Sequence, residues 1–229
     1  MPPPIIVHGF FDNYAQAVGK IQKEIGNNFT VKFTKNNTNI FCKSKEQWTK
    51  VNKLLNEQQV EFHTYIPAEE KTHAFVLRGL DQRPTPKEIA EDLENNYNLL
   101  ADKIYEMKGT ARPLYLVVMD KNITIDKLEK HIRIVLYTKV QWERHQNNKL
   151  IVQCHRCQEW GHATSNCHAN PKCLKCAGPH LTRECEHGHL NSPKCANCNG
   201  DHVANSTMCP IYIKKIEFIN QLRQTKDTK

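Results

Sequence analysis

Hydrophobic and polar positions follow two periods along residues 1–66. Apolar side chains recur every three or four residues from Tyr14 to Ile25 and again from Trp48 to Leu55, which is typical of helices with one buried face. Shorter patterns typical of strands lie at residues 5–7, 29–33, 38–42 and 60–65. The segment therefore predicts the order βαββαβ, with Ser44 as the N-cap of the second helix.

The same order recurs after a predicted linker at residues 67–72. Strand patterns lie at residues 74–80, 100–107, 114–119 and 134–142, and helices are expected from Thr85 and from Thr124. Pro86 at the first helical position and Glu88 in the first turn mark the start of the earlier helix. We therefore expect an α+β protein with two ferredoxin-like, RRM-like βαββαβ domains at residues 1–66 and 73–152.

RNA-binding modules of this fold stack bases on aromatic side chains of the sheet. Here Ile6 and Val76 stand where the first stacking aromatic is expected, and residues 112–119 offer only Tyr115. Both sheets are thus poor stacking platforms, and the alternative is that they serve as scaffolds or protein-contact surfaces. The fold by itself leaves the activity open.

Nine of the ten cysteines lie within residues 154–209, and Cys42 stands apart. The nine form three Cys-x2-Cys pairs, each followed by a His and a further Cys. Disulfides are the alternative for such a cluster in a secreted chain, but this order of residues favours tetrahedral zinc. Residues 153–210 therefore predict three CCHC zinc knuckles and three zinc ions, with the ligands Cys154, Cys157, His162, Cys167; Cys173, Cys176, His180, Cys185; and Cys195, Cys198, His202, Cys209.

Four protein ligands close each predicted site, so we expect structural rather than catalytic zinc and folding that depends on metal. The sequence has no His-x-Glu motif of zinc deaminases, no Gly-rich phosphate loop and no nucleophile elbow. These observations predict a protein that is not an enzyme and has no small-molecule substrate.

Candidate nucleic-acid contacts surround the knuckles. Trp160 precedes His162, and we expect its ring to be half-exposed and to stack on a base, unless it merely covers the metal site. Arg156 is a candidate contact to a phosphate or a base edge. Further candidate phosphate contacts are Lys172, Lys175, Arg183 and Lys194, although such side chains are commonly just solvated. The spare histidines are expected to make surface or phosphate contacts rather than to exchange with the ligands: His155, His168, His187 and His189.

Charge narrows the choice of partner. The chain carries a formal net charge of +8, and residues 154–229 hold ten Lys and Arg against six Asp and Glu. This balance favours single-stranded RNA, or DNA, as the partner. No run of 18 apolar residues and no secretion signal is present, so we expect an intracellular, cytoplasmic or nuclear protein without a membrane partner.

Residues 211–229 predict a short helix that either packs on the third knuckle or drives self-association, followed by a disordered end from Gln224.

The knuckle segments Gln153–His162, Cys173–His180 and Cys195–His202, with the preceding Phe75–Leu80 and Val140–Glu143, resemble the Gag-like first-reading-frame proteins of insect jockey-type non-LTR retrotransposons. The resemblance covers residues 73–212. It implies binding of the element's own RNA, self-association into ribonucleoprotein particles and strand-annealing chaperone activity, without catalysis. Two alternatives stay open: a scaffold that works mainly in assembly, and a host protein domesticated from such an element.

Overall fold

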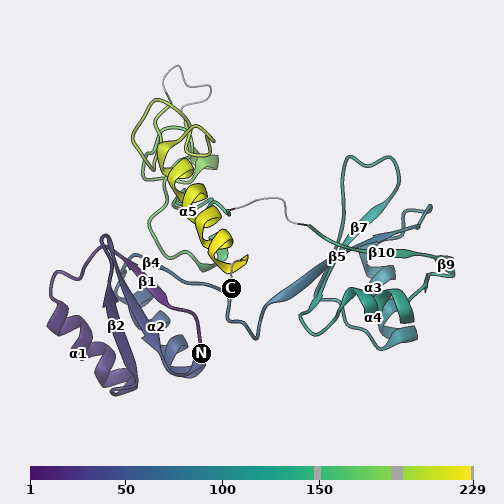
Figure 1. Cartoon of the computed structure of the whole chain (residues 1–229), viewed down its shortest axis with the longest axis horizontal. Helices are drawn as coiled ribbons and strands as arrows, with labels where there is room; N and C mark the ends of the chain where they lie inside the picture. Colours follow the sequence, from purple (N-terminus) through teal and green to yellow (C-terminus); the bar gives the residue numbers. More distant parts are fainter. Residues whose placement is uncertain (147–150, 187–192, 228–229) are drawn as a thin grey trace. The chain divides into compact units, whose positions relative to one another are not determined.

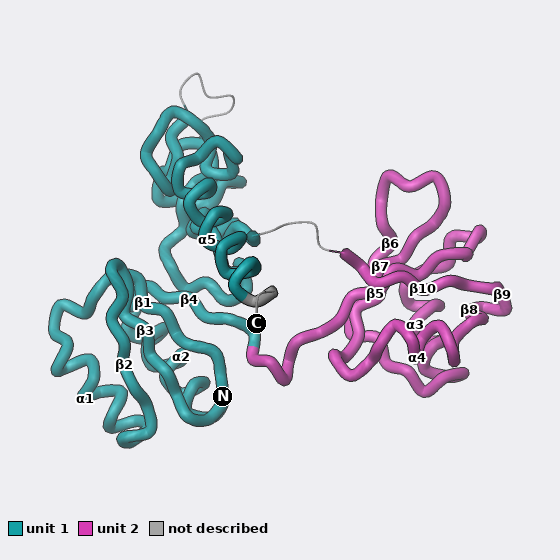
Figure 2. The backbone as a smooth tube through the Cα atoms, in the orientation of Figure 1, with its two compact units in different colours: residues 1–66, 149–229 teal, residues 67–148 magenta. Residues whose placement is uncertain are grey.

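The computed structural model describes residues 1–146, 151–186 and 193–227, which form two compact units. The first unit joins residues 1–66 to residues 149–229, and the second contains residues 67–148 (Figure 2). The second unit is therefore inserted in the sequence between the two segments that form the first. Each unit is described by itself.

The first unit begins with a four-stranded antiparallel sheet of order β2-β3-β1-β4 (Figure 1). Its elements follow the order βαββαβ: β1 (Ile5–His8), α1 (Tyr14–Ile25), β2 (Phe29–Phe33), β3 (Asn37–Cys42), α2 (Lys45–Glu57) and β4 (Phe62–His63). The Ser44 hydroxyl accepts a hydrogen bond from the Gln47 main-chain N–H, and Oε1 of Gln47 accepts one from the Ser44 main-chain N–H. This capping box is the reason α2 begins where the sequence predicts.

One core lies between the sheet and its two helices. Alternate residues of β1 and β3 point inward, because successive side chains of a strand face opposite sides. They meet one stripe of each helix to form a buried cluster: Ile5, Val7, Ile21, Ile25, Ile40, Cys42, Val51, Leu55 and Phe62. Each fully buried aliphatic side chain contributes about 1.5–3 kcal/mol to folding.

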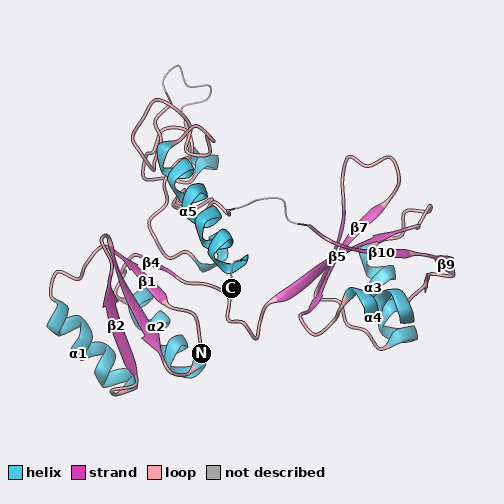
Figure 3. Cartoon of the chain, viewed as in Figure 1, coloured by secondary structure: helices cyan, strands magenta, loops and turns pink. Residues whose placement is uncertain are grey.

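The second unit has another four-stranded antiparallel sheet, of order β10-β5-β7-β6. Thr85 and Glu88 form a capping box at its first helix, with Pro86 in the first turn. The helices again pack on one face of the sheet, as Figure 3 shows. The elements are β5 (Thr72–Arg78), α3 (Pro86–Tyr97), β6 (Lys103–Glu106), β7 (Leu114–Asp120), α4 (Ile125–His131), β8 (Ile134–Val135), β9 (Thr138–Lys139) and β10 (Gln141–Arg144).

The single final strand predicted at residues 134–142 is wrong. β8 and β9 form a two-residue hairpin, and only β10 joins the sheet. Leu136 and Tyr137, at the hairpin turn, have φ of 49° and 60°, a left-handed conformation that strands do not contain. Neither residue type signals such a turn, so the apolar pattern conceals it.

The outward face of the second sheet lacks the one aromatic that the sequence offered. Tyr115 on β7 is fully buried among the core residues, and its hydroxyl donates to the main-chain oxygen of Pro84 at 2.7 Å. It therefore cannot stack on a base, whereas Tyr105 on β6 of the same sheet is 50% exposed.

The chain ends in a long helix, α5 (Pro210–Asp227), which follows the knuckles in the first unit. The predicted disorder from Gln224 is wrong as far as Asp227, because helix-favouring residues continue past that point without Gly or Pro. No helix within the described ranges is both long and apolar enough to cross a membrane.

Candidate metal centres and nucleic-acid interface

Three copies of one tight turn hold the first two cysteines of each predicted knuckle. In every copy the main-chain N–H four residues after the first cysteine donates to that cysteine's carbonyl, at 2.8–3.0 Å. The main-chain N–H two residues after the same cysteine donates to its Sγ at 3.4 Å. The residue after the second cysteine is left-handed each time: Gln158, Ala177 and Asn199, with φ of 66°, 59° and 62°.

Each turn brings four ligand atoms together. The three Cys3His groups of the sequence analysis all assemble, and within each group the ligand atoms lie within 4.8 Å of one another. The second cysteine and the histidine of each group approach to 3.4, 3.6 and 3.4 Å between Sγ and Nε2. The donor set and spacing fit a tetrahedral metal ion.

Glycines give the histidine room in the loop in two different ways. The first knuckle has one more residue between its second Cys and its His, and Gly161 there takes φ of 118°. In the second, a Cβ on Gly178 would lie 2.7 Å from Cε1 of His180, and on Gly200 of the third it would lie 3.2 Å from Cε1 of His202. Glycine is therefore required for its absent side chain at Gly178 and for its backbone freedom at Gly161.

Hydrogen bonds from main-chain N–H groups stabilise the thiolate form of two cysteine ligands, Cys173 and Cys209. Burial raises the pKa of Cys173, but the N–H groups of Cys176 and Lys175 stabilise its thiolate and bring the pKa down to about 6. Burial likewise opposes ionisation of Cys209, and the N–H of Tyr212 helps to lower its pKa to about 7. The lowering does not extend to every ligand, because burial raises the pKa of Cys195, in the same site as Cys209, to about 11. Metal binding must therefore still displace thiol protons.

The three knuckles pack into one body. The side-chain amide of Gln153 donates to the carbonyl of Ala204 at 2.8 Å, and that of Asn197 donates to the carbonyl of Gln158 at 2.9 Å. Both bonds join the first knuckle to the third. Gln158, which is 1% exposed, also donates to the carbonyl of Lys172 between the first and second knuckles. The modules are therefore fixed to one another through the side-chain amides of one buried residue and two partly buried ones.

The first knuckle also joins the sheet of the first unit at β4, a contact that sequence reasoning missed. The N–H of Thr64 donates to the carbonyl of Asn166 at 3.0 Å, and the N–H of His168 donates to the carbonyl of Phe62 at 2.8 Å. These bonds extend the edge of the sheet with the end of the knuckle. Only residues about 100 positions apart make this contact, so no local pattern could have indicated it.

Two pairs of stacked rings cover the same junction. The ring of the zinc-ligand candidate His162 lies 4.0 Å from that of His63, and His168 lies 4.3 Å from Phe62, both with 12° between planes. His168 is exposed, as expected of a surface histidine, while its ring also packs on Phe62. Of the other spare histidines, His155 is exposed, whereas His187 and His189 lie outside the described residues.

The expectation that Trp160 is half-exposed is wrong. The residue is 8% exposed, and its ring lies 4.7 Å from that of Tyr212 on α5. Lys215 on the same helix donates to the carbonyl of Trp160. The helix therefore covers the indole, so that its ring is not free to stack on a base.

The candidate phosphate contacts differ in how far they are engaged. Arg156 is partly buried, and its Nε donates to the carbonyl of Ala169 at 2.6 Å. Arg183 is exposed and lies 3.6 Å from a carboxylate oxygen of Glu184. Lys194 is exposed, while Lys172 and Lys175 are half-buried. All five lie on the knuckle body, and Arg183 and Lys194 offer the most accessible charge.

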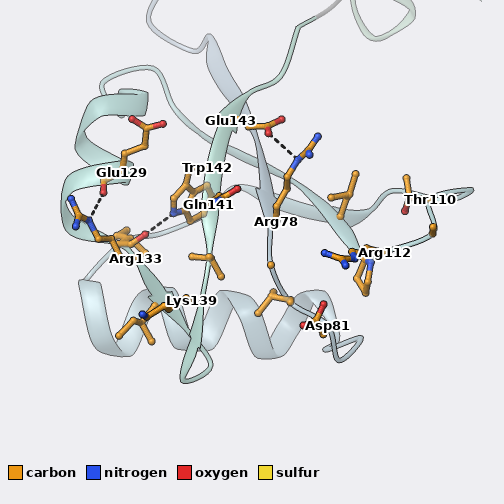
Figure 4. Close-up of a pocket in the computed structure, with 18 residues that line it drawn as sticks. Arg78, Asp81, Thr110, Arg112, Glu129, Arg133, Lys139, Gln141, Trp142 and Glu143 are labelled. Atoms are coloured by element: carbon orange, nitrogen blue, oxygen red, sulfur yellow. Dashed lines mark hydrogen bonds and ion pairs between the residues drawn. The ribbon is translucent and has the colours of Figure 1, made fainter.

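The second unit has a hollow of its own at the end of its sheet, with a volume of about 1380 Å³ (Figure 4). Four basic residues line it: Arg78, Arg112, Arg133 and Lys139. Arg78 is paired with Glu143 at 3.0 Å, and Arg133 donates to the carbonyl of Glu129. Two of these basic side chains are thus already engaged within the unit, which makes the hollow a weaker anion site than the knuckle body.

Comparisons with known proteins agree with this geometry. No protein-family model matches the chain. The nucleic-acid-binding protein from transposon X-element of Drosophila melanogaster is 28% identical over 138 residues, 57% of this chain and 28% of its own length. The nucleic-acid-binding protein from mobile element jockey of the same species is 26% identical over 149 residues, 57% of this chain and 26% of its own length.

The chain is a homologue of nucleic-acid-binding proteins from jockey and X-element mobile elements. The retrotransposon resemblance drawn from the knuckle motifs is thereby confirmed. A jockey protein of Drosophila funebris, 26% identical over 126 residues, covers 52% of this chain. This chain spans only about a quarter of the length of the curated relatives that it matches.

Proposed function

We propose that this chain is a zinc-dependent single-stranded nucleic-acid-binding protein that packages retrotransposon RNA into ribonucleoprotein particles. The observation that carries the proposal is the knuckle body, in which twelve Cys and His side chains of the predicted knuckles assemble into three four-ligand groups. Its homologues are named nucleic-acid-binding proteins of mobile elements. Both observations support a protein that binds nucleic acid.

Zinc is the ion that best suits the three groups. Cys3His is a common structural zinc set, and four protein ligands leave the ion no open position. The ions would hold the knuckles folded, because the buried cluster of the first comprises only Cys154, Cys157, Cys167 and Ala169. The metal would thus be structural, and the basic side chains around it would bind the nucleic acid.

Phosphate contacts rather than base stacking would supply most of the affinity. Arg183 and Lys194 offer accessible charge, and the nearby Arg156, Lys172 and Lys175 add to it. We leave Trp160 out of the contact set because α5 covers its ring. Binding through phosphates carries little sequence preference, which suits both packaging and strand annealing.

The two βαββαβ domains, one in each unit, are proposed to be RRM-like scaffolds. Both show the strand order expected of that fold, in which the first and third strands lie at the centre. The buried Tyr115 and the aliphatic Ile6 and Val76 favour a role in positioning and protein contact. We propose that the protein works in the cytoplasm or nucleus, where element RNA is present.

Fluorescence anisotropy with a labelled single-stranded RNA over a salt series tests the proposal. The affinity should fall steeply with salt, and Arg183→Gln should weaken binding and reduce the salt slope by about one. Lys87→Gln, which removes an exposed charge on α3 that pairs with Glu91, is the control and should change neither. Salt-independent binding would exclude phosphate contacts as the source of affinity.

A second candidate is an assembly scaffold, favoured by exposed apolar residues on α5. Ile213, Phe218 and Leu222 are 41%, 60% and 47% exposed. Light scattering on the full chain with and without Phe218→Ser measures this directly. Loss of oligomers with RNA affinity retained would show that self-association uses this helix.

A further inference from the structure

A fourth cluster of metal-binding side chains lies where the first knuckle meets the sheet. Nε2 of His8 on β1 lies 2.7 Å from Nδ1 of His63 on β4. Oε2 of Glu159, in the loop of the first knuckle, lies 3.8 Å from the same Nε2. All three potential ligand atoms lie within 4.8 Å of one another. None of these residues belongs to the three knuckle ligand sets.

The cluster is held in place by the junction rather than by flexible surface side chains. His63 is 7% exposed and is stacked on His162. The side chain of His8 is 16% exposed and that of Glu159 is 40% exposed. One buried imidazole, one partly buried imidazole and one partly accessible carboxylate therefore lie close together, with the carboxylate the most exposed.

We propose that His8, His63 and Glu159 bind a fourth divalent metal ion of the zinc type, which fastens the first knuckle to the sheet. Ligand atoms about 2.1 Å from a tetrahedral zinc lie about 3.4 Å from one another. The observed separations of 2.7 and 3.8 Å lie on either side of that value. Two imidazoles and a carboxylate are a known zinc set that leaves the fourth position to water.

The competing account is a hydrogen bond between His8 and His63 with no metal. It explains the 2.7 Å separation and leaves the charge of Glu159 facing Lys215, but it gives Glu159 no hydrogen bond to His8, because 3.8 Å is too long. A metal ion uses all three groups and compensates the negative charge of Glu159.

The fourth ion should bind more weakly than the knuckle ions. The site offers three protein ligands and no thiolate, and the positive charges of Lys172 and Lys215 act on the two histidines. We therefore expect it to fill last in a titration. Its ligands come from the sheet and the knuckle, so its binding stabilises their junction.

The test is the zinc content of the full chain after equilibration with free zinc, measured by elemental mass spectrometry. The wild type should hold four ions, and His8→Ala and Glu159→Gln should each hold three. His131→Ala, at the exposed end of α4, is the matched control and should hold four. With cobalt, the fourth equivalent should add no thiolate-to-metal charge-transfer absorption, since the site contains no cysteine.

Three ions in the wild type, or four in both site variants, would overturn the proposal. If His8→Ala disturbs the junction and holds fewer than three, Glu159→Gln decides the question, because it keeps the shape of the side chain. Three ions in that variant support the site, and four exclude it.

Discussion

Single glycines decide whether the histidines of the later knuckles can reach their metal. Gly178→Ala would place a Cβ 2.7 Å from Cε1 of His180 and displace that ligand. We expect the variant to hold one zinc ion fewer, or to bind it at least about tenfold more weakly, which is about 1.4 kcal/mol. Competition with a chromogenic chelator measures this.

The matched control is Gly19→Ala in α1, where nothing lies within 4 Å of the added Cβ. Its zinc content should be unchanged, and the unit should gain about 0.5–1 kcal/mol of helix stability. Unchanged zinc affinity in Gly178→Ala would show that the loop relaxes around the methyl group.

Cys42 should differ in reactivity from the other nine cysteines. It is 2% exposed in the core of the first unit, and burial raises the pKa of its thiol to about 11. Since the thiolate is the reactive form, Cys42 should resist iodoacetamide at pH 8, and its alkylation should begin only as the pH approaches 11. Mass spectrometry of chelator-treated protein should find nine modified cysteines. Rapid labelling of Cys42 at pH 8 would mean that the first unit opens when zinc is lost.

At the scale of elements, the junction between β4 and the first knuckle is the least predictable feature. His168→Ala removes a ring stacked on Phe62 and the contact of its Nδ1 with Oδ1 of Asn56 at 3.1 Å. We expect the junction to lose about 0.5–1.5 kcal/mol, as is typical of aromatic pairs. The melting temperature and cleavage by limited proteolysis at residues 164–170 report this loss.

His155→Ala is the control on the same knuckle, because His155 is exposed and hydrogen bonds are made by its main chain, whose N–H donates to Thr164 and whose carbonyl accepts from Gln158. It should leave both readouts unchanged. Equal effects of the two substitutions would show that the first knuckle does not depend on its contact with β4.

Elements set by local chemistry could be predicted from the sequence, and those set by distant contacts could not. Ser44 and Thr85 cap their helices as expected because the partners, Gln47 and Glu88, lie three residues away. The twelve knuckle ligands likewise lie close together along the chain.

The turn at Leu136 and Tyr137 was missed because neither residue type favours φ above 0°. The covering of Trp160 by Tyr212 joins segments 52 residues apart, so no spacing could indicate it.

At the scale of the whole molecule, each unit has its own core, and the metal-binding groups belong to the first. The three knuckles are joined to one another by side-chain amides and to β4 by main-chain bonds. Metal removal should therefore disturb more than isolated loops. The second unit, with its own capped helices and core, should keep its fold when zinc is removed.

The most direct test of the central claim is binding of a labelled single-stranded RNA to the full chain before chelation, after chelation and after zinc is returned. We expect the affinity to fall by about tenfold or more on chelation, equivalent to about 1.4 kcal/mol, and to recover with zinc. Undiminished binding by the chelated protein would contradict the account and assign the nucleic-acid site to the sheets of the two βαββαβ units.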